Sequence, residues 1–429
     1  MCFWRRDTIN SAGSEDKENH MRRVAVTGLG IVSPLGNDVD TFWNNLVNGV
    51  NGIAPITKID TTDYKAKVAA EVRDYDAKPY MSKSDYLHSD LYTKFAMGAA
   101  TQAIEESGIA GTLPGERVGV YIGTGTGGIA TLMENHVKLL EGGPRKVSPF
   151  FIPMMISNMA SGMIAIKYQF KNSAMPMVTA CASGTNAIGE AMRLIRHGYA
   201  DAMITGGAEA TINALSVAGF AKMGALSFAE DPNEASLPFD KRRSGFVMGE
   251  GAGVIVLEEY EHAKARGAHI YAELAGYGTT CDAYHMTSPH PEAEGGARAI
   301  ADALAEAKID TDKVYYNAHG TGTAMNDKCE TIAVKKAFGE ERAKKILISS
   351  TKPMTGHMLG AAGGAEAVAS VMALETGMVP PTINLYEPDP ELDLNYVPLK
   401  AVEADLEAAV SSSLGFGGHN GSLAFVKTK

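Results

Sequence analysis

The chain has 429 residues, 45% of them hydrophobic and 21% charged, which is the composition of a globular protein with two or three domains. Acidic residues outnumber basic ones by 50 to 39, and the net charge of −11 argues against nucleic acids and anionic membranes as partners, because both favour a basic face. No apolar run approaches the roughly 20 residues that span a bilayer, so no transmembrane helix is expected.

Residues 1–20 form a polar segment whose composition differs from that of the rest of the chain. Arg5 and Arg6 resemble the basic start of a secretory signal, but the roughly 7–15 apolar residues that such a signal requires do not follow. We therefore interpret residues 1–20 as a polar leader or tag that is expected to be disordered, with Met21 as the start of the fold.

From Met21 onward, short β-branched runs alternate with helical stretches of small residues. Strands are predicted at residues 23–27, 118–122, 202–205 and 254–257, and helices at 41–47, 94–107 and 182–196. The second part of the chain repeats this rhythm, with strands at 271–276, 314–317, 346–349 and 423–426 and helices at 295–306 and 359–375. The alternation predicts an α/β protein with a mostly parallel sheet that helices cover on both faces.

Two matching segments suggest a weak internal duplication. One strand leads through Cys181 into the helix at 182–196, and another leads through His357 into the helix at 359–375. Both helices are rich in glycine and alanine. Two related halves that meet at a shared site would place these helix starts side by side, an arrangement that the sequence alone leaves open.

Familiar nucleotide-binding and hydrolase motifs do not account for this chain. Residues 123–128 formally match G-x-G-x-x-G, but no acidic residue ends a second strand about 20 positions later, so a cluster of turn glycines is the better interpretation. The sequence has no G-x-x-x-x-G-K-[ST], G-x-S-x-G or H-E-x-x-H. Nucleotide kinases, α/β-hydrolases and zincins are therefore excluded.

Cys181 is the candidate nucleophile among four scattered cysteines. Because no C-x-x-C pair occurs, we expect neither a disulfide framework nor a zinc knuckle, and we expect a cytoplasmic protein. Cys181 lies between an apolar strand and a small-residue helix, where the helix dipole and free N–H groups favour a thiolate that accepts an acyl group. Cys2, Cys281 and Cys329 lack this context and are expected to be inert.

Three further segments place polar groups at glycine-rich junctions. His319 follows a predicted strand in N-A-H-G-T-G-T, and His357 precedes a small-residue helix in S-S-T-K-P-M-T-G-H. Phe416 is the one aromatic residue of S-L-G-F-G-G-H-N-G, where glycines let backbone N–H groups approach a ligand. Each segment alone is more often structural, so only the combination points to a site.

Together with V-T-A-C-A-S-G around Cys181, these ordered motifs resemble the β-ketoacyl-[acyl carrier protein] synthases, most closely type II of bacterial fatty-acid synthesis. The likeness runs from about Met21 to the end of the chain. It implies a thiolase-like α/β fold in which two related halves form a five-layered αβαβα core. The halves are residues 21–269, with the nucleophile, and residues 270–429, with both histidines. A homodimer is also implied.

The resemblance further implies a decarboxylative condensation that elongates fatty-acid chains. Cys181 takes an acyl group from acyl carrier protein, and the backbone N–H groups of Cys181 and Phe416 bind the oxyanion. His319 and His357 stabilise the enolate that forms when malonyl-carrier protein loses CO2, and attack of this enolate gives 3-oxoacyl-carrier protein. The substrates arrive on phosphopantetheine, and no metal or redox cofactor is expected.

Supporting roles are implied by the same resemblance. Lys352 supports the histidines, and Glu366 is a buried acid that neighbours a structural monovalent cation. Phe416 also gates the acyl pocket.

Substrate-binding positions are implied for Thr321 and Thr323, which border the pantetheine path, and for Thr126 in the acyl pocket. Two positions depart from the family pattern. Ala324 stands where many members have proline, and Thr126 stands where they have isoleucine or a bulkier residue. The preferred acyl-chain length is therefore not predicted.

A local positive patch is expected to dock the strongly acidic carrier protein, since the whole chain at −11 repels it. Arg145 and Lys146 match family positions that face the carrier, and Lys65 and Lys67 are further candidates. Gly224 stands at a position where the family has a basic residue, so the patch is incomplete there.

Two alternative functions remain open from the sequence. A thiolase or another coenzyme A–dependent enzyme has a similar fold, but the two-histidine pattern argues against it. A non-condensing partner subunit, which sets chain length for an active sibling, lacks the nucleophilic cysteine, so Cys181 argues against that alternative.

Overall fold

The computed structural model describes residues 21–428, and the expected leader at 1–20 lies outside the described residues. Ten strands form one continuous sheet in the order β10-β9-β13-β14-β8-β1-β7-β6-β4-β5. In chain order these are β1 (Val24–Val32), β4 (Val118–Gly123), β5 (Ala174–Met177), β6 (Ala202–Glu209), β7 (Gly251–Glu259), β8 (Ala272–Cys281), β9 (Val314–Asn317), β10 (Leu347–Ser349), β13 (Ala408–Gly415) and β14 (His419–Val426). Two small two-stranded antiparallel sheets complete the strands: β2 (Ala54–Pro55) with β3 (Val68–Ala69), and β11 (Met378–Val379) with β12 (Val402–Glu403).

The sheet consists of two halves with the same topology. When the five strands of each half are numbered along the chain, both halves have the order 3-2-4-5-1, and the two first strands, β1 and β8, join them. The junction is short, because only Ala25 and Val26 of β1 pair with β8. This repeated order reveals the internal duplication that the sequence only suggested.

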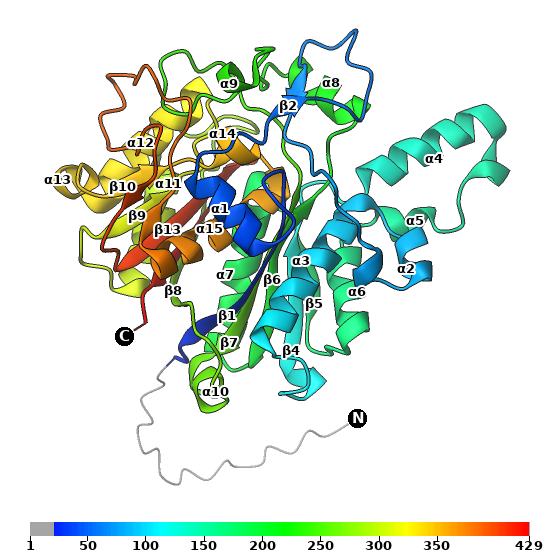
Figure 1. Cartoon of the computed structure of the whole chain (residues 1–429), viewed down its shortest axis with the longest axis horizontal. Coiled ribbons are helices and arrows are strands. Elements are labelled where there is room, and N and C mark those ends of the chain that lie inside the picture. Colours follow the sequence, from blue (N-terminus) through cyan, green and yellow to red (C-terminus); the bar gives the residue numbers. More distant parts are fainter. Residues whose placement is uncertain (1–20, 429) are drawn as a thin grey trace, which may run out of the picture.

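Helices complete a five-layered core, as the thiolase-like fold requires. Figure 1 shows α7 (Ser183–Arg196) and α15 (Ala362–Thr376) between the two groups of strands, and each helix contacts strands of both halves. On the outer side of the first half, α3 (Leu91–Ser107) and α6 (Met159–Tyr168) cover the strands. On the outer side of the second half, α11 (Glu294–Ala307) packs on β8 and β14, and α12 (Ala324–Phe338) packs on α11.

The remaining helices lie at the ends and edges of this core. An arm made of α4 (Ile129–Gly142) and α5 (Phe151–Met155) projects from the body (Figure 1). The others are α1 (Val39–Val47), α2 (Lys83–Leu87), α8 (Ala214–Lys222), α9 (Pro232–Ala235), α10 (Tyr260–Ala265), α13 (Glu340–Ala343) and α14 (Lys352–Thr355). Among residues 21–428, no helix has the length and apolar character needed to cross a membrane.

The expectation of a mostly parallel sheet is wrong, because the sheet is mixed. Four neighbouring pairs are parallel and five are antiparallel. The connection from β13 to β14 shows the cause: only Phe416, Gly417 and Gly418 join them, and three residues can form a hairpin but not a crossover. Gly417 and Gly418 have φ of 86° and 75°, which the tight turn requires.

Candidate active site

Cys181 sits on a strained elbow between β5 and α7. It belongs to the 3₁₀ turn η4 (Ala180–Ala182), and the preceding Ala180 has a φ of 51°, a left-handed conformation that costs free energy for a residue with a Cβ. The side chain is buried, with 7% of its surface exposed. The elbow therefore holds the thiol in one fixed position at the start of a helix.

Both predicted histidines lie beside this thiol. His319 lies two residues after the end of β9. The backbone N–H of His357 donates to the Val247 carbonyl at 2.7 Å, which fixes the position of this residue. One ligand atom from each of Cys181, His319 and His357 lies within 4.8 Å of the others. The two imidazole rings are edge-to-face, with centroids 5.1 Å apart. Residues far apart in sequence thus form one compact cluster.

Lys352 provides a positive charge behind the cluster. Its Nζ donates to Glu366 Oε1 at 2.5 Å, and both side chains are buried. Burial, together with the charge of Lys352, lowers the pKa of His319 and of His357 well below the usual value near 6.5. Both rings are therefore neutral at neutral pH.

The thiol environment corrects one expectation. Burial raises the pKa of Cys181 to about 12, although Lys352 and the backbone N–H groups of Phe416 and Cys181 act in the opposite direction. The expected resting thiolate at the helix start is therefore wrong, because desolvation outweighs the favourable N–H groups. Cys181 must lose its proton as a substrate binds or reacts.

The turn at Phe416 brings a backbone donor to the thiol. Gly415 approaches so closely that a Cβ there would lie 3.3 Å from the Cys181 nitrogen and 2.8 Å from the Thr179 oxygen. Glycine at this position is thus required by packing. The N–H groups of Phe416 and Cys181 both act to lower the pKa of the Cys181 thiol, as donors near the sulfur do, and they are the candidates for an oxyanion hole.

One cavity of about 390 Å³ opens onto the cluster. Its lining includes the predicted residues Cys181, His319, His357, Phe416, Thr321 and Thr323. The hydroxyls of Thr321 and Thr323 lie 2.9 Å apart and hydrogen-bond to each other. Thr126 does not line this cavity: it is exposed, and its hydroxyl donates to Glu209 at 2.7 Å. The structure thus gathers all the motif residues but leaves Thr126 outside.

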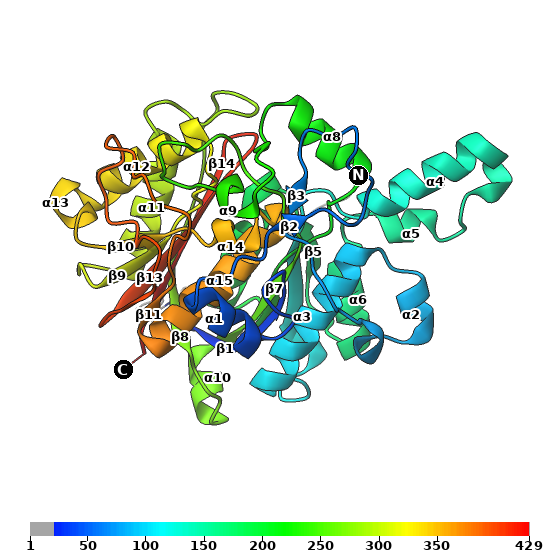
Figure 2. The ribbon, with the colours of Figure 1, turned by 45° about the horizontal axis from the view of Figure 1, so that its top comes forward.

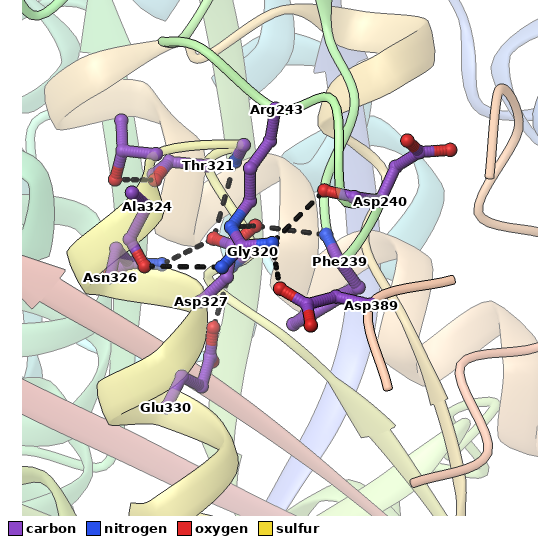
Figure 3. A network of polar contacts seen from close by, with 12 residues as sticks. Phe239, Asp240, Arg243, Gly320, Thr321, Ala324, Asn326, Asp327, Glu330 and Asp389 are labelled. Carbon is purple, nitrogen blue, oxygen red and sulfur yellow. Dashed lines mark hydrogen bonds and ion pairs between the residues drawn. The ribbon is translucent and has the colours of Figure 1, made fainter. Parts of the chain in front are cut away.

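Two buried carboxylates that no sequence motif predicted hold the loop after His319 (Figure 3). Glu330 accepts the N–H groups of His319 and Gly320, each at 2.7 Å, and burial raises its pKa to about 7. Asp327 accepts the N–H of Gly322 at 3.2 Å. Both acids lie on α12, so this helix fixes the histidine loop from behind.

Arg243 ties this network to another segment of the chain. Its guanidinium lies 4.0 Å from Asp327 and 2.7 Å from Asp389 (Figure 3). Asp327 and Glu330 are three residues apart on the helix that follows the loop of His319. This spacing places both acids on one face of the helix, and it could have identified them from the sequence.

The candidate docking residues fall into two groups. Lys65 is exposed, whereas the Nζ of Lys67 donates to the Thr61 carbonyl at 2.7 Å in its own loop. Arg145 and Lys146 are exposed on the turn η3 (Pro144–Lys146), which joins α4 to α5 at the outer end of the arm. Met223 and Gly224, which directly follow α8, line the cavity. Figure 2 shows the arm extending away from α8.

Comparison with known families accounts for most of the chain. Residues 21–263 match the family model of the β-ketoacyl synthase N-terminal domain, and residues 271–386 match that of the β-ketoacyl synthase C-terminal domain. A 3-oxoacyl-[acyl-carrier-protein] synthase 2 from Synechocystis sp. is 51% identical over 409 residues, which is 95% of this chain and 98% of the relative. The relative of the same name from Staphylococcus aureus (strain COL) is 48% identical over 408 residues, with the same coverage.

Solved structures show the same similarity. One is a type II polyketide acyl-carrier protein in complex with its ketosynthase, which superimposes with a TM-score of 0.88 at 37% identity. Another is a β-ketoacyl synthase from Burkholderia phymatum, with a TM-score of 0.88 at 34% identity. Each match covers 95% of this chain and 100% of the solved chain.

Proposed function

The chain belongs to the β-ketoacyl synthase family and is a condensing enzyme of fatty-acid elongation, and from this premise we propose how its site acts. It joins acyl-carrier protein to malonyl-carrier protein and releases 3-oxoacyl-carrier protein, CO2 and free carrier protein. Relatives near 50% identity over almost the full chain support this function over a coenzyme A–dependent thiolase or a non-condensing subunit.

The observation that carries the proposal is the thiol with two neutral imidazoles in one cavity. Cys181 Sγ attacks the acyl thioester, and the N–H groups of Cys181 and Phe416 stabilise the oxyanion. The bond between the acyl carbon and the carrier sulfur breaks, and the proton that Cys181 loses ends on the departing phosphopantetheine thiolate, which frees the first carrier protein as a thiol. His319 and His357 then donate to the thioester oxygen of malonyl-carrier protein as its C–C bond breaks and CO2 leaves.

The last step joins the two chains. The enolate carbon attacks the acyl group on Cys181 and the C–S bond breaks. Cys181 leaves as a thiolate and takes up a proton from solvent, which restores the thiol. Lys352 keeps both histidines neutral in this scheme, and Thr321 and Thr323 line the path of the phosphopantetheine arm. No redox cofactor or catalytic metal is needed, because carbon dioxide loss supplies the carbanion.

A direct assay tests this function. The protein is incubated with malonyl-carrier protein and acyl-carrier proteins of graded chain length, and the products are identified by mass. A product two carbons longer with a 3-oxo group is expected, and its distribution would also give the chain-length preference. Absence of any 3-oxo product with all primers would contradict the proposal.

Phe416 is proposed as a gate as well as an N–H donor. Its ring is half-buried and lines the cavity. The neighbouring residues of the turn are Gly415, Gly417 and Gly418, the last two with positive φ, and none of them has a side chain that would restrict the ring. Thr126 is proposed to border the acyl chain, which would extend beyond the described cavity.

We also propose that two copies associate through β5. This strand ends the ten-stranded sheet, so one side of its backbone is unpaired, and Met175 is 44% exposed. Exposed apolar side chains continue over the arm and α6, namely Leu132, Val137, Leu139, Leu140, Phe150, Ile152 and Ile166. Pairing of β5 with its copy would cover both features, and sedimentation at twice the chain mass is expected.

Carrier-protein docking is proposed at the cavity mouth and at the arm. Changing both residues, Arg145→Glu and Lys146→Glu, should raise the KM for carrier-bound substrates by about tenfold, while small pantetheine thioesters react as before, because only the carrier surface meets these charges. Salt above about 0.15 M should mimic the defect in the unaltered protein. The arm extends away from the body of its own chain (Figure 2). In the proposed dimer, Arg145 and Lys146 would therefore bind the carrier protein that delivers substrate to the cavity of the second copy.

The matched control changes two other basic residues, Lys344→Glu and Lys345→Glu. These exposed residues directly follow α13, and their substitution changes the net charge by the same amount. It should leave the KM unchanged. Equal losses with carrier-bound and small thioesters would show that Arg145 and Lys146 are structural.

A structural monovalent cation is proposed beside Glu366. Several buried side-chain oxygens have no hydrogen-bond partner among the described residues, and three of them lie on elements that pack together: Asn317 Oδ1, Ser411 Oγ and Glu366 Oε2. Asn317 and Ser411 are register partners on β9 and β13, and α15, which carries Glu366, packs on both strands. Such an oxygen set suits a hard cation, which would satisfy these oxygens and hold α15 against the sheet.

Potassium or sodium chloride should therefore raise the Tm by about 1 °C over tetramethylammonium chloride at equal ionic strength, for roughly 1 kcal/mol of binding free energy. The large organic cation does not fit among these oxygens. Ser411→Ala should abolish the difference, because it removes one ligand. Identical Tm values in all three salts for the unaltered protein would rule out the site.

A cytoplasmic location completes the proposal. Cys181, Cys281 and Cys329 are free thiols, which suits a reducing compartment.

A further inference from the structure

The second half of the fold contains an elbow that matches the one at Cys181. Leu359 has a φ of 48° and begins the turn η5 (Leu359–Ala361), just as Ala180 with its φ of 51° begins η4. Each turn leads into a central helix, α15 or α7. Gly360 therefore occupies in the second half the position that Cys181 has in the first.

The two elbows are packed against each other without intervening side chains. A Cβ added at Gly184 would lie 3.0 Å from the Gly360 carbonyl oxygen, and one added at Gly207 would lie 2.3 Å from it. Leu359 also lines the cavity together with Cys181 and His357. A displacement of the second elbow would therefore move a wall of the reaction cavity.

Glu209, at the end of β6, fills this second elbow with a carboxylate. Its Oε2 accepts the backbone N–H groups of Gly125 at 2.7 Å and of Gly360 at 3.0 Å. Two N–H groups thus converge on one oxygen, as they would on an oxyanion. Oε1 accepts the hydroxyls of Thr126 at 2.7 Å and of Thr124 at 3.1 Å.

The carboxylate of Glu209 is costly to bury. Glu209 has no exposed surface, its hydrogen-bond partners are neutral hydroxyl and N–H groups, and burial raises its pKa. An apolar side chain would avoid this cost but would leave the N–H groups of Gly125 and Gly360 without an acceptor, so the value of Glu209 lies in the donors that it holds. Its donors come from the loop after β4 and from the start of α15, so it links the two halves directly behind Cys181.

We propose that Glu209 is a positioning residue whose carboxylate fills the anion-binding elbow of the second half and holds Leu359 and the start of α15 where condensation at Cys181 requires them. The assay rests on the proposed function, since condensation is the activity measured. An unaltered protein that forms no 3-oxo product would refute that function, whereas the variants below test Glu209 alone.

Chemical rescue is the decisive experiment. Glu209→Ala should lower kcat for condensation by about 10²-fold, a loss typical of a misplaced catalytic geometry, while the KM for carrier-bound substrates stays near its original value. Sodium acetate supplies the atoms that the substitution removes, a methyl carbon and a carboxylate. It should restore kcat at least about tenfold in a saturable manner, and sodium chloride at equal ionic strength should not.

Two further variants keep the test sharp. Glu209→Gln preserves the shape, but either orientation of its amide turns the NH2 group toward a backbone N–H, because Oε2 accepts those of Gly125 and Gly360 and Oε1 accepts that of Thr126 at 3.3 Å. The value of kcat should therefore fall even if the alanine variant does not fold. Glu258 on β7 is also fully buried, and it accepts hydrogen bonds from Thr27 at 3.0 Å and from Arg266 at 2.7 Å. Glu258→Ala is the matched control, and acetate should not raise its activity.

The outcomes separate positioning from simple packing. Saturable rescue of kcat by acetate in Glu209→Ala supports the proposal. Near-normal kcat in Glu209→Gln, a folded Glu209→Ala that acetate does not rescue, or equal rescue of Glu258→Ala would each overturn it.

Discussion

Cys181→Ala is expected to reduce condensation by more than about 10⁴-fold, because no acyl-enzyme can form without the thiol. Decarboxylation of malonyl-carrier protein should continue, since His319 and His357 still line the cavity beside the vacant position. The two activities are measured separately, condensation by product mass and decarboxylation by CO2 release. Retained acyl transfer from acyl-carrier protein to the variant would show that another residue is the nucleophile.

Cys281→Ala is the matched control for this experiment. Cys281 is the exposed thiol among the described cysteines and does not line the cavity, so its loss should leave condensation unchanged. Because burial raises the pKa of Cys181 to about 12, a small alkylating reagent should label Cys281 first. Inactivation should nevertheless follow the slower labelling of Cys181. Inactivation that parallels the labelling of Cys281 would contradict the assignment.

Elements with strong local patterns could be predicted from the sequence. The strand at 314–317 matches β9 at both ends, and the helices at 94–107 and 295–306 match α3 and α11 within three residues. By contrast, β13 was missed because its sequence, A-A-V-S-S-S-L-G, has a single β-branched residue, Val410, among small residues that are not typical of a strand. Its serines are buried and pair with distant side chains, such as Ser413 with Thr185 at 2.7 Å. Only the assembled fold supplies those partners.

The site shows the same division between local and distant information. Ordered motifs were enough to predict that Cys181, His319 and His357 share one cavity. The protonation of the thiol was predicted wrongly, since desolvation depends on every element that covers the residue. Glu209 and Glu330 could not be ranked from the sequence, because their importance lies in backbone N–H groups that the fold brings to them.

His319→Ala and His357→Ala should each slow decarboxylation by about 10²–10³-fold, the typical cost of losing one donor to a developing oxyanion. Acyl transfer to Cys181 should be affected less, because its oxyanion is bound by the backbone N–H groups of Cys181 and Phe416. Asparagine at either position is the informative second variant. It retains an N–H donor without a titrating ring, so it should recover part of the decarboxylation rate.

The pH dependence distinguishes a donor from a base. Burial and the charge of Lys352 hold the pKa of both histidines well below the usual value near 6.5. The rings therefore stay neutral as the pH falls through 6.5, and decarboxylation by Cys181→Ala should remain level between about pH 7.5 and 6. An imidazole with an ordinary pKa would be half protonated within this range, so a decline centred near 6.5 would contradict the lowered values. If both alanine variants lost acyl transfer but kept full decarboxylation, the histidines would act as bases for the thiol, and their role as enolate donors would have to be abandoned.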